Sequence, residues 1–242
     1  MSLVYDAGFE AGAATGGGGG SYDEGVEFGR QLAQDEFWAD VQGRGSLKDY
    51  TASFGAWTND ENFKPQYDII PTHARHMFAR SKITDLVGIL KRQGVTLDFS
   101  KATANNELSY LCYLSEITTL PTIDLRGHGN NNYNFYNATK LRSIEKIILD
   151  ATGNNYNFTT TFDGCTSLVD VTFENFFKQS SVNMKWCPLS RASIESVMAA
   201  LGDTASGKTL TLKQSAVNAV FTTEEWETLV ATKPNWTITL SA

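Results

Sequence analysis

Phe162-Asp163-Gly164-Cys165-Thr166-Ser167-Leu168-Val169-Asp170-Val171 is the stretch that decides the predicted fold. Three of its residues are apolar and regularly placed: Phe162 lies six residues before Leu168, and Val171 lies three residues after it. The same triplet occurs three more times: Met77, Ile83 and Leu86; Leu111, Ile117 and Leu120; Phe135, Leu141 and Ile144. A register that persists while the intervening residues change indicates stacked structural units. We therefore predict a short solenoid with these twelve residues as its repeat core and its exposed face free for binding.

Each unit is predicted to contain a polar turn with one aromatic residue, then an anchor residue, then a short strand. Apolar and polar residues alternate after the anchors, which is typical of strands that bury one face. The predicted strands cover Thr119–Leu125, Glu145–Asp150 and Leu168–Phe173. The first members of successive triplets are separated by 34, 24 and 27 residues, so the predicted units differ in length.

The stretch from Phe162 to Val171 resembles the F-x-G-C-x-x-L-x-x-I/V core of BspA-type leucine-rich repeats. The resemblance implies a mixed α/β fold in which residues 68–186 form degenerate leucine-rich repeats. A repeat family of this kind implies a surface for interaction rather than a reaction. We therefore expect a protein that is not an enzyme and that needs no cofactor.

Residues 187–242 are predicted to form a C-terminal capping unit of helix, strand, helix and strand. Ser190 precedes the first helix and Gly202 closes it. Thr222 and Glu225 have the spacing of a capping box at the start of the second helix, and Phe221 and Trp226 that of a hydrophobic staple. The predicted elements cover residues 190–201, 209–212, 223–232 and 236–240.

The N-terminal part divides into residues 1–21, rich in glycine, and residues 22–67. A run of five glycines, Gly16–Gly20, favours a tether that is flexible or ordered by a partner. The alternative is a helix with a stripe of glycines, because Gly8, Gly12, Gly16 and Gly20 recur every fourth residue. Beyond the tether, we predict an amphipathic helix from Tyr22 to about Gln42 and an aromatic-rich capping segment from Asp49 to Tyr67.

The last unit and the Tyr-Asp-x-Gly N-terminus resemble proteins encoded by prophages of Gram-positive gut bacteria. That resemblance implies a phage virion or tail protein that takes part in structure or receptor recognition. It would attach to other virion proteins through its N-terminal segment and form a homo-oligomer within the assembly. A bacterial cell-surface adhesin or scaffold module is the alternative.

Gly202-Asp203-Thr204-Ala205-Ser206-Gly207-Lys208-Thr209 matches the G-x-x-x-x-G-K-S/T pattern of a phosphate-binding loop. A phosphate-binding loop needs a strand before it and a helix after it, so that a helix N-terminus faces the phosphates. Here the predicted order is reversed, with a helix before the loop and a strand after it. We therefore interpret the segment as a polar turn after a glycine-terminated helix.

Asparagine and tyrosine gather in two predicted turns that begin 24 residues apart, at Asn130 and Asn154. One interpretation is an asparagine ladder, in which stacked side-chain amides pair with backbone groups at a tight bend. The other is a binding patch in which rigid tyrosines and adaptable asparagines meet a host-surface protein or a glycan. The candidate binding residues are Asn131, Asn132, Tyr133, Asn155 and Tyr156.

Composition limits the other functions. The chain has 242 residues, 41% of them hydrophobic, and a net charge of -7 with scattered Lys and Arg, so we expect no nucleic-acid partner. The N-terminus lacks the pattern of a signal peptide, and no apolar run is long enough to span a bilayer. We expect a virion or extracellular surface protein that is made in the cytoplasm and released by lysis or assembly.

The sequence shows no metal-ligand pattern. His73 and His76 lack partners at ligand spacing, so no metal site is expected. We interpret Cys112, Cys165 and Cys187 as core residues, because free cysteine packs as a small hydrophobe.

Overall fold

The computed structural model describes residues 60, 61, 63, 65, 68–70, 74, 77–100, 108–127, 131–151, 158–177, 180–203 and 207–242. Several expectations from the sequence lie outside these residues. They are the glycine-rich segment 1–21, the helix over 22–42, nearly all of the capping segment to residue 67, the histidines at 73, 76 and 128, and the second Asn-Tyr turn.

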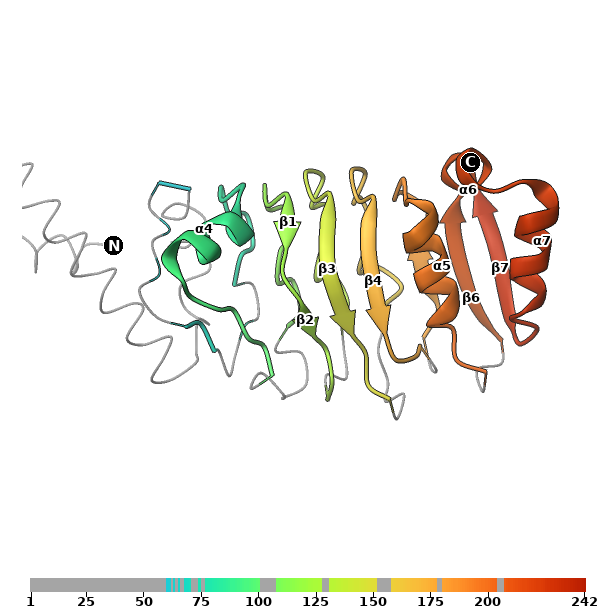
Figure 1. Ribbon diagram of the computed structural model, residues 1–242, viewed down its shortest axis with the longest axis horizontal. Helices are drawn as coiled ribbons and strands as arrows, with labels where there is room; N and C mark the ends of the chain where they lie inside the picture. The colour runs from blue at the N-terminus through green and yellow to red at the C-terminus, as the bar shows by residue number, and fades with distance from the viewer. Residues whose placement is uncertain are drawn as a thin grey trace, which may run out of the picture.

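The described residues form a mixed α/β structure with two parallel sheets and four helices (Figure 1). The first sheet contains β1 (Thr119–Leu120), β2 (Ile123–Asp124), β3 (Ser143–Ile148) and β4 (Asp170–Glu174). The second contains β5 (Val182–Met184), β6 (Lys208–Lys213) and β7 (Trp236–Ser241). The helices are α4 (Leu86–Gln93), α5 (Arg191–Ala199), α6 (Gln214–Val220) and α7 (Thr223–Ala231).

The predicted leucine-rich-repeat solenoid is wrong. The described strands belong to two separate parallel sheets interspersed with helices, not to one repeating coil. The predicted C-terminal order of helix, strand, helix and strand is also incomplete, because α6 and α7 both lie between β6 and β7. Nothing in the hydrophobic pattern of residues 214–220 distinguished a helix from a loop.

The first sheet follows the predicted alternation with shifted ends. β3 lies between β4 on one side and β1 with β2 on the other. β1 and β2 were predicted as one strand, but Pro121 and Thr122 separate them; proline has no N–H group to donate to a ladder. Both short strands still pair with β3 in parallel, through Leu120 with Ile144 and through Ile123 with Ile147.

A second parallel ladder runs through the turns that precede these strands. The N–H of Phe78 donates to the carbonyl of Leu111 (2.8 Å), that of Cys112 to Asn134 (2.6 Å) and that of Phe135 to Thr161 (3.1 Å). Phe78, Cys112 and Phe135 are therefore equivalent along the ladder. The sequence register assigns Met77 and Leu111 to this position in the first two units. The hydrogen bonds instead assign the next residue in each unit, Phe78 and Cys112.

The core lies between the turns and the first sheet. All twelve residues of the apolar triplets are buried, with exposed fractions between 0% and 3%. Aromatic rings extend this core, because the ring centres of Phe135 and Phe162 are 5.6 Å apart and those of Phe158 and Phe177 are 4.9 Å apart. Burying a large apolar side chain contributes about 1.5–3 kcal/mol, so these residues account for much of the stability of the described region.

The three cysteines are free and buried, as predicted. The thiol of Cys165 donates to the carbonyl of Phe135 at 3.0 Å, which adds a weak hydrogen bond to its packing. Desolvation raises the pKa of all three thiols well above the ordinary value of cysteine. Because the thiolate is the reactive form, these cysteines serve packing rather than chemistry.

Helix α5 ends the first sheet. The N–H groups of Val171 and Phe173 on the outer edge of β4 donate to the hydroxyls of Ser193 and Ser196, each at 2.8 Å. The backbone N–H and C=O groups of a helix are paired within the helix and cannot bond to a further strand, so the first sheet ends at β4. In Figure 1, α5 lies beside β4, and β6, β7 and α7 form the far end.

The starts of helices α5 and α7 follow the predicted capping, whereas the predicted end of the first helix at Gly202 is wrong, because α5 ends at Ala199 with Ala200 as its C-cap. Ser190 caps α5 by accepting from the N–H of Ser193. The capping box of Thr222 and Glu225 is present at the start of α7, and the ring centres of Phe221 and Trp226 are 5.9 Å apart. These local predictions are confirmed because a cap involves only residues close in sequence.

We expect Ser193→Ala to lower the free energy of unfolding by about 1–3 kcal/mol, because it leaves the buried N–H of Val171 without a partner. Urea denaturation followed by circular dichroism measures this change. Ser215→Ala on an exposed position of α6 is the matched control, and its effect should stay within about 0.5 kcal/mol. Equal unfolding midpoints for Ser193→Ala and the control would show that the serine does not stabilise the sheet edge.

Candidate functional site

Four tyrosines from two neighbouring turns form a partly exposed array, called here the tyrosine cluster: Tyr110, Tyr113, Tyr133 and Tyr136. Tyr110 stacks on Tyr133 with ring centres 4.9 Å apart and planes 5° apart. Tyr113 stacks on Tyr136 with centres 5.8 Å apart and planes 20° apart. Within each turn the two rings meet edge to face, at 5.6 Å and 5.3 Å. Each ring therefore has two aromatic neighbours, which holds it in one orientation.

The backbone of these two turns explains how the rings come to be stacked. Tyr110 and Tyr133 have φ values of 61° and 63°, and Leu114 and Asn137, four residues later in each turn, have φ values of 54° and 56°. Residues other than glycine adopt this left-handed region at a cost of about 1–3 kcal/mol. The two turns have the same shape and are joined by the N–H of Leu114, which donates to the carbonyl of Tyr136 at 3.0 Å.

The structure places the predicted binding residues unevenly. Tyr133 belongs to the tyrosine cluster, and Asn132 is partly exposed beside it. Asn131 is fully buried, so its side chain lies beneath the surface. Asn155 and Tyr156 fall outside the described residues.

The sequence interpretation missed Tyr110, Tyr113 and Tyr136. A signal for them exists: Tyr110-Leu111-Cys112-Tyr113 and Tyr133-Asn134-Phe135-Tyr136 repeat a Tyr-x-x-Tyr pattern 23 residues apart. The apolar triplets do not include these tyrosines, because partly exposed residues that stack at the surface do not follow the pattern of buried apolar positions.

Two buried asparagines lie beneath the cluster. The carboxamide of Asn134 donates to the side-chain oxygen of Asn131 at 3.2 Å, and the hydroxyl of Thr161 donates to the backbone carbonyl of Asn131 at 2.7 Å. Among the described residues, Nδ2 of Asn131 and Oδ1 of Asn134 have no hydrogen-bond partner. These two amides pair with each other inside a single turn. The predicted asparagine ladder would also involve residues 154–157, which lie outside the described residues.

A polar strip continues the surface beyond the cluster, and we define it as Thr160, Asp163 and Asn183. The N–H of Asn137 donates to the carbonyl of Asp163 at 2.8 Å, so Asp163 follows Tyr136 along the ladder. Its carboxylate accepts from Nδ2 of Asn183 at 3.0 Å. The hydroxyl of Thr160 donates to the side-chain oxygen of Asn132 at 3.1 Å, which connects the strip to the cluster.

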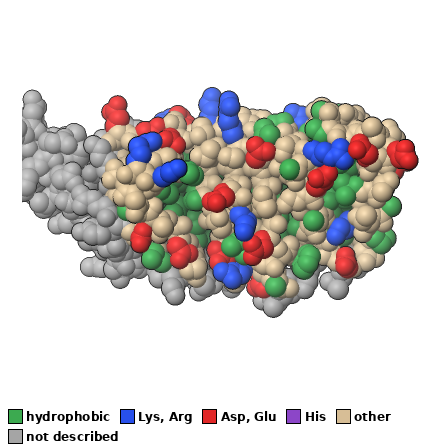
Figure 2. Space-filling view, viewed as in Figure 1, with side chains coloured by type: hydrophobic (Ala, Val, Ile, Leu, Met, Phe, Trp, Pro, Cys, Tyr) green, Lys and Arg blue, Asp and Glu red, His purple; other side chains and the backbone are tan. Residues whose placement is uncertain are grey.

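The electrostatics of this surface are close to neutral. Phenol and carboxamide groups carry no charge near neutral pH. Desolvation raises the pKa of Asp163 above its ordinary value, and the positive charge of Lys185 opposes that increase. The space-filling view shows basic and acidic side chains interspersed over the visible face rather than gathered by sign (Figure 2).

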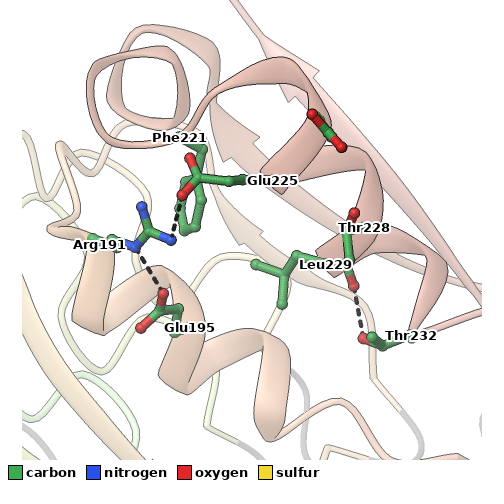
Figure 3. Close-up of a pocket in the computed structure, with 8 residues that line it drawn as sticks. Arg191, Glu195, Phe221, Glu225, Thr228, Leu229 and Thr232 are labelled. Carbon is green, nitrogen blue, oxygen red and sulfur yellow. Dashed lines mark hydrogen bonds and ion pairs between the residues drawn. The ribbon is translucent and has the colours of Figure 1, made fainter.

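A shallow groove of about 430 Å³ lies between α5 and α7 (Figure 3). Its central residue, Arg191, donates to the carboxylates of Glu195 (2.9 Å) and Glu225 (3.0 Å) and to the carbonyl of Val220 (3.0 Å). The guanidinium carbon also lies 4.5 Å from the ring centre of Phe221. Because the cation already has these partners inside the protein, the groove serves to join the two helices.

The phosphate-loop lookalike has the reversed context that the sequence predicts. Helix α5 ends at Ala199 before the segment, and β6 begins at Lys208 within it. The carbonyl of Gly202 accepts from the indole of Trp236 at 2.9 Å, and that of Asp203 accepts from Asn235 at 2.6 Å. These backbone groups are acceptors in use, whereas a phosphate site needs free N–H donors.

The described residues contain neither a metal-binding cluster nor a membrane-spanning helix. No group of three or more His, Cys, Asp or Glu side chains in them is arranged to hold a metal ion. None of the helices in this part of the chain is both long enough and apolar enough to cross a bilayer.

Comparison with known proteins identified no protein similar to this chain. No protein-family model matches the chain, and no curated protein or solved structure is significantly similar to it.

We expect the stabilising effect of Glu225 to depend on pH. Its hydrogen bond from the N–H of Thr222 and its pairing with Arg191 lower its pKa below the ordinary value of 4.5. The ionised form therefore stabilises the fold above about pH 4.5, and this contribution is lost as pH falls through the lowered pKa. Thermal unfolding should show Glu225→Gln melting below wild type at pH 7, with a smaller difference at pH 3. A pH-independent difference would contradict this assignment.

We expect no saturable binding of a fluorescent ATP analogue by wild-type protein at concentrations up to about 1 mM, because a helix precedes the segment and a strand follows it, so no helix N-terminus faces the phosphates. Lys208→Ala should give the same titration curve. Saturable binding that Lys208→Ala abolishes would contradict the interpretation of this segment as a turn.

Proposed function

We propose that this protein is a non-enzymatic recognition protein that binds its target through the tyrosine cluster. The observation that carries the proposal is the stacking of four partly exposed tyrosines in two matching turns. Tyrosine offers a large contact area with few rotatable bonds, so a rigid array loses little conformational entropy when it binds.

The backbone supports a binding role over a purely structural one. A stacked aromatic pair contributes about 0.5–1.5 kcal/mol beyond its burial, whereas each left-handed tyrosine costs about 1–3 kcal/mol. The four ring contacts and the two left-handed tyrosines therefore contribute opposing energies of similar size, about 2–6 kcal/mol each in total, so the stacking leaves little net stabilisation. Strained residues kept on a surface by the surrounding ladder are typical of sites that bind a partner.

The place of the protein in a phage virion or tail is part of the same proposal and depends on the sequence resemblance described above. In that setting the N-terminal segment would attach to other virion proteins and the tyrosine cluster would face the host. A bacterial cell-surface adhesin is the second candidate, because the same surface would suit adhesion. Mass spectrometry of purified phage particles and of cell-wall fractions distinguishes the two locations.

We expect the double substitution Tyr110→Ala and Tyr133→Ala to reduce binding of fluorescently labelled protein to Gram-positive gut bacteria by at least about tenfold. The reason is that it removes one stacked pair and releases the orientation of the other two rings. Flow cytometry over a concentration series measures the change.

Phe176→Ala is the matched control, because Phe176 is an aromatic residue with 45% exposure that lies outside the cluster. The control should bind like wild type, and circular dichroism should show that all variants are folded. Wild-type binding by the double variant would contradict the proposal.

A further inference from the structure

Recognition of a sugar needs two kinds of group side by side. Aromatic rings pack against the apolar C–H faces of a pyranose, and amide or carboxylate groups exchange hydrogen bonds with its hydroxyls. The polar groups must be held in place, because each freely rotating side chain would lose entropy on binding. The described surface meets these requirements where the tyrosine cluster adjoins the polar strip.

The ladder brings the two kinds of group together. Tyr113, Tyr136 and Asp163 occupy successive equivalent positions, so the column of rings ends at a carboxylate. Tyr136 has Tyr113 stacked on one side, and Asp163 is the next residue on its other side. Aromatic face and hydrogen-bonding group are therefore neighbours.

The polar groups at this junction are already oriented. Asn183 donates to one oxygen of Asp163, and Thr160 donates to Asn132. Asn137 lies over Gly164, where an added Cβ would approach its side-chain oxygen to 2.0 Å; Gly164 has φ +77°. Because Gly164 has no side chain and a φ that favours glycine, it leaves room for the side chain of Asn137 beside Tyr136.

Charge and shape favour a neutral sugar over an anionic ligand or a protein. The charged groups at the junction, Asp163 and Lys185, have opposite signs. The large apolar side chains with the highest exposure come from separate segments of the chain: Ile70, Leu114, Val169, Phe176 and Trp186. A protein interface of ordinary size would need about 800 Å² from this partner with an apolar centre.

We infer that the tyrosine cluster and the polar strip form a binding site for a neutral oligosaccharide. Sugar rings pack on Tyr133 and Tyr136, and their hydroxyls bond to Asp163 and to the amides beside it. This inference rests on the proposed function, since it names the ligand class of the same surface.

An array of neutral and acidic oligosaccharides, followed by calorimetry with the best neutral ligand, tests the inference. Wild-type protein should bind neutral glycans, and Tyr136→Ala should weaken binding at least tenfold. Tyr136→Phe, which keeps the ring, should stay within about threefold of wild type, and Asp163→Asn should weaken binding several-fold. Phe176→Ala should bind like wild type.

The outcomes separate this inference from the proposal on which it rests. One outcome is that no neutral glycan binds while bacterial cells are still captured through Tyr110 and Tyr133. In that case the inference of a neutral oligosaccharide ligand is wrong, but the proposed recognition function is supported. Binding to acidic glycans only, or to a protein on the cell surface, would overturn the inference in the same way. If neither glycans nor cells are bound, the proposed function fails as well.

Discussion

The parallel ladder of hydrogen bonds between successive turns is the constraint on which the other features depend. It aligns Phe78, Cys112 and Phe135 and so places apolar side chains over one another in the core. Tyr136 comes directly after Phe135 and is partly exposed, so the same ladder that stacks the core also stacks the tyrosines. Core and candidate site therefore share one geometric cause, and a change in register would disturb both.

The two sheets follow from how the chain satisfies strand edges. An exposed row of N–H and C=O groups would be available for unwanted pairing. At β4 the hydroxyls of Ser193 and Ser196 occupy that row, and the helix that carries them prevents another strand from joining. The C-terminal region repeats this use of side chains, because Lys233 and Trp236 donate to carbonyls just beyond α5. Side chains that bond to the backbone at the edge of β4 therefore separate the first sheet from the second.

A rigid surface on a ladder suits recognition better than a loop would. Each tyrosine is held by two rings, and Asp163 is held by Asn183. These side chains lose their conformational entropy when the protein folds. They therefore lose little more when a ligand binds, which favours tighter binding. By contrast, the cation of Arg191 is already paired with Glu195 and Glu225, and the carbonyls of Gly202 and Asp203 accept hydrogen bonds from within the fold.

The sequence by itself determined the features that depend on near neighbours or on simple burial. Apolar positions in a fixed register, the serine cap of α5, the capping box of α7 and the reversed context of Gly202–Thr209 could all be read directly, because each involves residues a few positions apart. Tertiary structure alone decided the division into two sheets, the burial of Asn131 and the assembly of the tyrosine cluster. Those depend on which turn lies against which, and a backbone ladder between segments 23 residues apart carries no local signal that hydrophobic periodicity can detect.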